Sequence, residues 1–257
     1  MRRVMIWLLA GTIAVGVTVL SFLPAAWMSP ILERQTGGRV SLGDAQGTLW
    51  NGSAFIGGAP GGNDPLTPLV PGRFAWRLSP AVLIGRVSVD VDNPSALAQP
   101  VKITGSWSQW QISPSQIMVT ADRLAGLGAP LNTIQLSGQM RLSWGVLQLV
   151  RQGNRVDLTG SLNLQMDDMA SRLSPIKPLG AYQLVMDWQG QQASAVLKTV
   201  KGPMMLSGTG MLSNGRMQFS GKAEAAPGQE ERLANLLNLL GQRRKEGNRD
   251  VIALEFR

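Results

Sequence analysis

Apolar and polar residues alternate one by one through much of the second half of the chain. From Leu136 to Trp144, apolar residues and one glycine alternate with serine, glutamine and arginine. From Val156 to Met166 the same period of two continues, with aspartate, threonine and asparagine among the polar positions. Successive side chains of a β-strand point to opposite faces, so this pattern predicts strands with one apolar and one solvated face.

Shorter segments repeat the alternation and predict further strands; they are residues 73–78, 87–92, 182–188, 217–224 and 251–256. Asn214-Gly215 is the strongest turn signal, because it favours positive φ at two successive positions, as a type I′ hairpin requires. Gly153-Asn154 and Gly190-Gln191 are weaker turn signals, and a loop is expected over residues 57–71. Successive strands joined by short turns predict an antiparallel meander.

One segment near the C-terminus has helical periodicity instead. Between Glu230 and Leu240, leucines recur at i, i+3, i+4 and i+7: Leu233, Leu236, Leu237 and Leu240. Two glutamates open the segment, Gly241 ends it, and Arg243, Arg244 and Lys245 follow as charges that complement the helix dipole. We expect this stripe to pack on the open sheet face; the alternative is a lid or a helix that docks a partner. A short helix is expected near residues 31–35, and residues 114–127 are ambiguous.

The N-terminus begins with an uncharged apolar run from Val4 to Leu23. In a helix this run would measure roughly 30 Å, the thickness of a bilayer core. Arg2 and Arg3 precede it, so the N-terminus is expected to be cytoplasmic. The rival interpretation is a cleaved signal peptide, but such a core is usually about 7–15 residues long and Pro24-Ala25-Ala26 is a weak cleavage sequence. The side chains expected to anchor the chain are Val4, Ile6, Leu8, Leu9, Ile13, Val17, Leu20 and Leu23.

The expected protein is therefore mainly β, with a transmembrane helix followed by an extended, curved antiparallel sheet of hairpins and a few short helices. Residues 1–3 would be cytoplasmic, residues 4–23 would cross a bacterial inner membrane once, and residues 24–257 would form a periplasmic β-rich domain.

Composition removes most catalytic chemistry. The chain has no histidine and no cysteine, which excludes Ser-His-Asp triads, thiolate nucleophiles and zinc sites built on imidazole or sulfur. Ser174 and Lys177 have the Ser-x-x-Lys spacing of penicillin-recognising enzymes, but the companion elements are missing. Asp90 with Asp92, and Asp167 with Asp168, are not expected to form a catalytic pair. We expect no catalytic residue, no metal and no cofactor.

The net charge is +8. A basic body could face anionic lipid or an acidic partner, and the simplest interpretation is a solvated surface. Nucleic acid would suit the charge, but the expected location outside the cytoplasm argues against it.

The most distinctive run is Gly47-Thr48-Leu49-Trp50-Asn51-Gly52-Ser53-Ala54, with Gly47, Thr48, Trp50, Gly52 and Ala54 as its key positions. It resembles the signature of the type II secretion system protein N family. Further segments resemble the same family: Trp76 to Pro80 with Leu83-Ile84-Gly85, Leu179 to Tyr182, and Gly202 with the segments at 208–210 and 219–223. From the residues alone, Trp50 reads as a core aromatic near a turn.

This resemblance implies a non-enzymatic, single-pass inner-membrane component of the machinery that exports folded proteins across the outer membrane. Its partners would be other subunits of that machinery, through protein contacts. The alternative is an AsmA-like envelope protein that handles lipid on the apolar face of its curved sheet.

Overall fold

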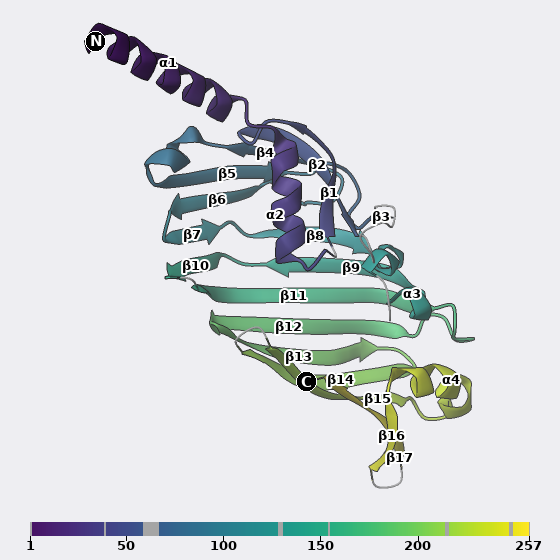
Figure 1. The fold of residues 1–257 in the computed structure, drawn as a ribbon. Coiled ribbons are helices and arrows are strands. Elements are labelled where there is room, and N and C mark those ends of the chain that lie inside the picture. The colour runs from purple at the N-terminus through teal and green to yellow at the C-terminus, as the bar shows by residue number, and fades with distance from the viewer. Residues whose placement is uncertain are drawn as a thin grey trace.

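A computed structural model describes residues 2–38, 40–58, 67–127, 131–153, 155–213, 216–246 and 249–256. The described residues form one antiparallel sheet of 17 strands (Figure 1). The strands are β1 (Val40–Gly47), β2 (Asn51–Gly58), β3 (Thr67–Pro68), β4 (Phe74–Leu78), β5 (Arg86–Asp92), β6 (Val101–Ser106), β7 (Gln109–Ile112), β8 (Ser115–Thr120), β9 (Leu136–Trp144), β10 (Leu147–Gln152), β11 (Arg155–Ser171), β12 (Gly180–Gly190), β13 (Gln192–Lys201), β14 (Met204–Ser213), β15 (Arg216–Ala225), β16 (Gln242–Glu246) and β17 (Arg249–Phe256).

Neighbours in the sheet are mostly neighbours in the chain. From β1 the pairing runs through β2, β4, β5 and β6 to β7. Strands β7 and β8 act as one interrupted strand, and so do β9 and β10, because β7–β10 and β8–β9 share one register. The long strand β11 then pairs with both β9 and β10 on one side and with β12 on the other. The meander continues through β13 and β14 to β15.

The last strands depart from chain order. Strand β15 pairs with β17, and β17 pairs with β16, so the final strand lies between β15 and the strand that precedes it in sequence. The helix α4 (Glu230–Leu240) links β15 to β16 and crosses this corner of the sheet.

The remaining helices are short or lie outside the sheet. They are α1 (Arg2–Ser21), η1 (Ala25–Trp27), α2 (Met28–Gln35), η2 (Pro80–Ile84), η3 (Ala121–Leu127) and α3 (Leu131–Ile134). Helix α2 packs along β1, where Ser29 and Ser41 hydroxyls meet at 3.0 Å and both donate to Glu33. Helix α1 projects away from the sheet at the β1–β4 end (Figure 1). Within the described residues, no helix has both the length and the apolar character needed to cross a membrane.

The buried core lies at the α4 end of the sheet. One cluster joins α4 to β14, β15, β17 and Leu179, which directly precedes β12, through residues that include Leu233, Leu236, Met204 and Ile252. A second, smaller cluster surrounds Tyr182. Along the middle of the sheet the apolar faces of β5 and β9 are only half-buried, and every second residue is exposed. The apolar face is therefore covered at one end and open along much of its length.

The predicted β-rich meander is confirmed, and several predicted boundaries are close to the observed ones. Strand β9 and helix α4 begin and end where the periodicity predicted, and β4 begins one residue later than predicted. The ambiguous segment 114–127 contains β8 and the 3-10 helix η3. Gly190 and Gln191 form the predicted turn between β12 and β13, whereas Asn154 and Asn214-Gly215 lie outside the described residues.

Two segments differ from what the sequence predicted. Arg243 and Arg244 follow the end of α4 as predicted, but they lie in strand β16, because Gly241 adopts an extended conformation (φ 172°) and the chain then pairs with β17. The loop expected over residues 57–71 is partly strand: β2 continues to Gly58, and β3 pairs with it. In both cases the segment became a strand because it pairs with a neighbouring strand. The glycine content of a segment does not indicate whether such a partner is available. Residues 59–66 lie outside the described part.

Candidate functional site: the junction of helix α1 with the sheet

The turn between β1 and β2 is attached to the segment that follows α1. The Leu49 amide donates to the Leu23 carbonyl at 2.8 Å, and Pro24 and Thr48 form an isolated β-bridge. The Trp50 indole Nε1 donates to the Leu20 carbonyl at 2.7 Å. Helix α1 therefore ends on a turn that belongs to the sheet.

The Trp50 contact supplies a donor that the helix lacks. In an α-helix the Leu20 carbonyl would accept from the amide four residues later, and that residue is Pro24, which has no N–H. Carbonyls at helix ends need another partner. The indole of Trp50 fills this role from a position 30 residues away in the chain.

The glycines of this turn are required by close backbone packing. Gly47 has φ +83°, and a Cβ there would lie 2.5 Å from the Asn51 carbonyl oxygen. A Cβ at Gly52 would lie 2.6 Å from the Thr48 carbonyl oxygen and 2.6 Å from Cζ2 of Trp76. Any larger residue at either position would push the turn away from its neighbours.

A second tryptophan braces the same turn from the next strand. The Trp76 indole Nε1 donates to the Leu49 carbonyl at 3.1 Å, and the Leu78 amide donates to the Trp50 carbonyl at 2.7 Å. Ala54, on β2, is fully buried. We call Gly47, Thr48, Trp50, Gly52, Ala54 and Trp76 the junction residues. The sequence predicted Trp50 as a core aromatic, and it did not predict that Trp50 bonds to the end of α1 or that Trp76 braces the turn that carries Trp50.

The anchor residues predicted on α1 are exposed. Leu8, Leu9, Ile13, Val17 and Leu20 are between 37% and 66% exposed, and Leu23 is half-buried beyond the end of the helix. The side chains of Val4 and Ile6 lie outside the described ones. Among the described side chains, exposed apolar groups also include Trp7 and Phe22, which are more than 70% exposed. This helix surface is apolar and is not covered by the sheet (Figure 1).

The leucine stripe of α4 faces the sheet. Leu233 is fully buried, Leu236 and Leu237 are nearly so, and Leu240 packs at the margin of the same cluster. These side chains contact Leu179, Met204, Ala223 and Ile252, so they are used to cover the C-terminal corner of the sheet.

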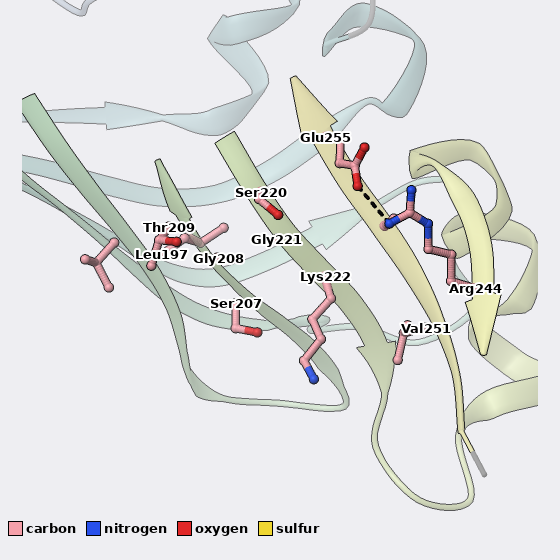
Figure 2. A pocket seen from close by; sticks show the side chains of 12 residues that line it. Leu197, Ser207, Gly208, Thr209, Ser220, Gly221, Lys222, Arg244, Val251 and Glu255 are labelled. Carbon is pink, nitrogen blue, oxygen red and sulfur yellow. Dashed lines mark ion pairs between the residues drawn. The ribbon is translucent and has the colours of Figure 1, made fainter. Parts of the chain in front are cut away.

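A shallow hollow of about 660 Å³ opens over strands β13 to β17 (Figure 2). Its ionic groups include Arg244 and Glu255, which form an ion pair at 2.8 Å, and Lys222. The hydroxyls of Ser207, Thr209 and Ser220 also line it, together with aliphatic side chains such as Leu197 and Val251. Within the described residues, no group of three or more acidic, histidine or cysteine side chains is placed to hold a metal ion.

The weak catalytic patterns of the sequence are not brought together. Ser174 is buried in a turn, where its hydroxyl donates to the Ile176 carbonyl at 3.1 Å, while Lys177 is exposed. Asp90 lies opposite Arg77 and Lys102 on neighbouring strands, as expected of a solvated face.

One ionisable group is strongly perturbed. Burial raises the pKa of the Tyr182 hydroxyl well above its usual value, and this hydroxyl donates to the Met204 carbonyl at 3.0 Å. A hydroxyl that holds its proton this firmly and bonds to backbone has a structural role.

Comparison with known proteins identifies a family. Residues 38–251 match the profile of the family described as "Type II secretion system (T2SS), protein N". The match begins next to β1 and reaches into β17, so it covers the sheet, α4 and the junction residues. No curated protein and no solved structure matches the chain.

Proposed function

Because the chain belongs to the type II secretion system protein N family, we propose that it is a non-enzymatic component of this system which holds a β-sheet platform at the inner membrane. The observation that carries the proposal is the junction: the Trp50 indole bonds to the end of α1, and Gly47 and Gly52 allow the close backbone packing of the turn that carries it. Secretion of folded proteins would then depend on protein contacts made by the platform.

The membrane location is part of this proposal. The uncovered apolar side chains of α1 support it, since such a surface is stable in lipid and costly in water. Arg2 and Arg3 would hold the N-terminus in the cytoplasm, with the sheet in the periplasm. Alkaline extraction of membranes, together with alkaline phosphatase fused after the last residue, tests this. Release of the protein, or an inactive fusion, would contradict the location.

The secretion role is tested by deletion and complementation. Cells without the protein should export less folded exoprotein, and wild-type protein should restore export. Crosslinking in detergent-solubilised membranes should capture other secretion subunits. A Trp50→Ala variant should complement poorly at equal protein level, whereas Trp27→Ala, a change at an exposed tryptophan near the same helix, should complement fully. Normal export in the deletion strain, with no captured subunit, would overturn the proposal.

A second candidate function is the binding of lipid acyl chains on the open apolar face. Two observations favour it: the middle of the face is only half-buried, and the Trp188 indole Nε1 is buried without a hydrogen-bond partner. Unsatisfied buried donors are uncommon in proteins. A bound lipid with an ester or hydroxyl oxygen would supply the missing acceptor once it displaced the side chains that cover this nitrogen.

Native mass spectrometry of the purified full chain tests this second function. Bound phospholipid should be detected and should be lost in Leu164→Glu, which places a charge on the apolar face between Leu142 and Leu184. Gln165→Glu changes the adjacent residue, on the opposite face, and should retain the lipid. Absence of lipid in wild-type protein would rule out this function without affecting the secretion role.

A further inference from the structure

Three large apolar side chains form an exposed tip at one edge of the sheet. The 3-10 helix η2 leaves Leu83 51% exposed and Ile84 78% exposed. Trp107, in the turn between β6 and β7, is 58% exposed, and its Nε1 donates to the Val82 carbonyl at 2.6 Å. We call Leu83, Ile84 and Trp107 the apolar tip. The indole hydrogen bond holds the two connections together, so the tip is one surface.

The backbone of η2 is held in a defined shape. Ser79 accepts from the Ala81 amide at its start, Pro80 occupies the first helical position, and Gly85 ends it with φ +89°. The Ser79 amide donates to the Ser88 carbonyl at 2.9 Å, which closes the loop at its base. The loop is therefore ordered, and it holds the Leu83 and Ile84 side chains in solvent.

The apolar tip lies next to the junction with α1. The Leu78 amide donates to the Trp50 carbonyl, and η2 begins two residues after Leu78. Trp50 in turn bonds to the Leu20 carbonyl of α1. In Figure 1, α1 extends toward the same side as the connection between β4 and β5, which contains η2. A membrane that contains α1 would pass close to this edge.

The charge around the apolar tip is positive. Arg86 pairs with Ser106 across β5 and β6, next to Trp107, and the Arg151 amide donates to the Ser108 carbonyl on the other side of the turn. Both arginines are exposed. The connections that carry the tip, residues 79–86, 106–109 and 151–153, contain no aspartate or glutamate. Tryptophan, aliphatic side chains and flanking arginines are the groups that favour the boundary between lipid headgroups and acyl chains.

We propose that the apolar tip inserts into the headgroup region of an anionic bilayer beside α1. This inference rests on the proposed membrane location of α1 and adds a second contact, which would fix how the sheet stands on the membrane. Arg86 and Arg151 would bind lipid phosphates, and the exposed apolar side chains would lie among the upper acyl groups.

Site-specific labelling of the full chain in vesicles tests the proposal, because the chain has no cysteine of its own. Three variants each carry one environment-sensitive fluorophore: Ile84→Cys in the tip, Val15→Cys in α1, and Val200→Cys. Val200 is 63% exposed and lies near the end of β13, so it is a matched control away from the tip. The vesicles are phosphatidylcholine with or without phosphatidylglycerol, and spin-labelled lipids quench any fluorophore in the bilayer.

The label at position 84 should be quenched several-fold more strongly than the label at position 200, and more so with phosphatidylglycerol present. Equal quenching at positions 84 and 200, with strong quenching at position 15, would contradict insertion of the apolar tip. It would still support the membrane location of α1. No quenching at position 15 would contradict the membrane location itself.

Charge variants separate lipid binding from simple proximity. Arg86→Gln with Arg151→Gln should remove the effect of phosphatidylglycerol on the label at position 84. Lys201→Gln, an exposed charge at the end of β13, should leave that effect unchanged. An unchanged effect in the double arginine variant would show that the arginines do not contact anionic lipid, against the proposal.

Discussion

At the scale of single residues, Trp50 adds a side-chain hydrogen bond to a junction that the Leu49–Leu23 hydrogen bond and the Pro24–Thr48 bridge also hold. Trp50→Phe keeps the ring and removes the N–H that the Leu20 carbonyl accepts. The loss of one such hydrogen bond should weaken the junction by about 1 kcal/mol. Hydrogen exchange of the Leu49 amide, which bonds to Leu23, should then quicken by about fivefold. As a control, Trp27→Phe changes an exposed tryptophan and should not alter the exchange rate of the Leu49 amide. If Trp50→Phe also leaves that rate unchanged, the indole does not hold the junction.

Tyr182 is the only tyrosine of the chain, which makes its titration easy to isolate. Its pKa in the folded protein lies above the unfolded value of 10.0, so the folded state holds the proton more tightly. The stabilisation is complete below pH 10 and is lost as the pH rises above it toward the folded pKa. Urea unfolding near pH 7 should show a cost of about 1 kcal/mol in Tyr182→Phe, from the lost bond to Met204.

The difference between the wild type and Tyr182→Phe should shrink above pH 10, because only the wild type loses stability through this group. All other side chains are the same in both proteins, so their effects on stability cancel in the comparison. A difference that stays constant with pH would show that the tyrosine is not buried as described.

At the scale of elements, α4 is stabilised by one face. Leu233→Ala empties a fully buried position in the cluster with Met204 and Ile252, and should lower the free energy of unfolding by about 2–5 kcal/mol. Leu239→Ala changes the same residue type on the same helix at 61% exposure, and should alter stability by less than about 0.5 kcal/mol. Equal effects at both positions, measured by urea unfolding, would contradict the packing of α4 on the sheet.

At the scale of the whole molecule, the pairing at the C-terminal corner is the feature that chain order does not predict. Lys222, Ala253 and Gln242 lie in one row across β15, β17 and β16. Adjacent strands are about 4.8 Å apart, so residues two strands apart exceed the reach of a disulfide, which needs Cα atoms within about 7 Å. Under oxidation, cysteines at 222 and 253 should crosslink, and cysteines at 222 and 242 should not. The opposite result would place β16 beside β15.

Local sequence determined the elements whose physics is local. A period of two predicted β9 with its observed ends, and leucine spacing with terminal glutamates predicted α4, because each pattern reflects the geometry of one strand or one helix. The resemblance to a family singled out Gly47, Trp50 and Gly52, but it did not indicate which contacts these residues make.

Only the tertiary structure decided what these elements do together. Trp50 bonds to the end of α1, and β17 pairs with β15. The basic run after α4 lies in a strand, and the Leu83, Ile84 and Trp107 side chains lie together at one side of the sheet. Each of these depends on hydrogen bonds or packing between residues far apart in the chain. Periodicity and turn signals do not register such contacts, since they describe only what each segment does by itself.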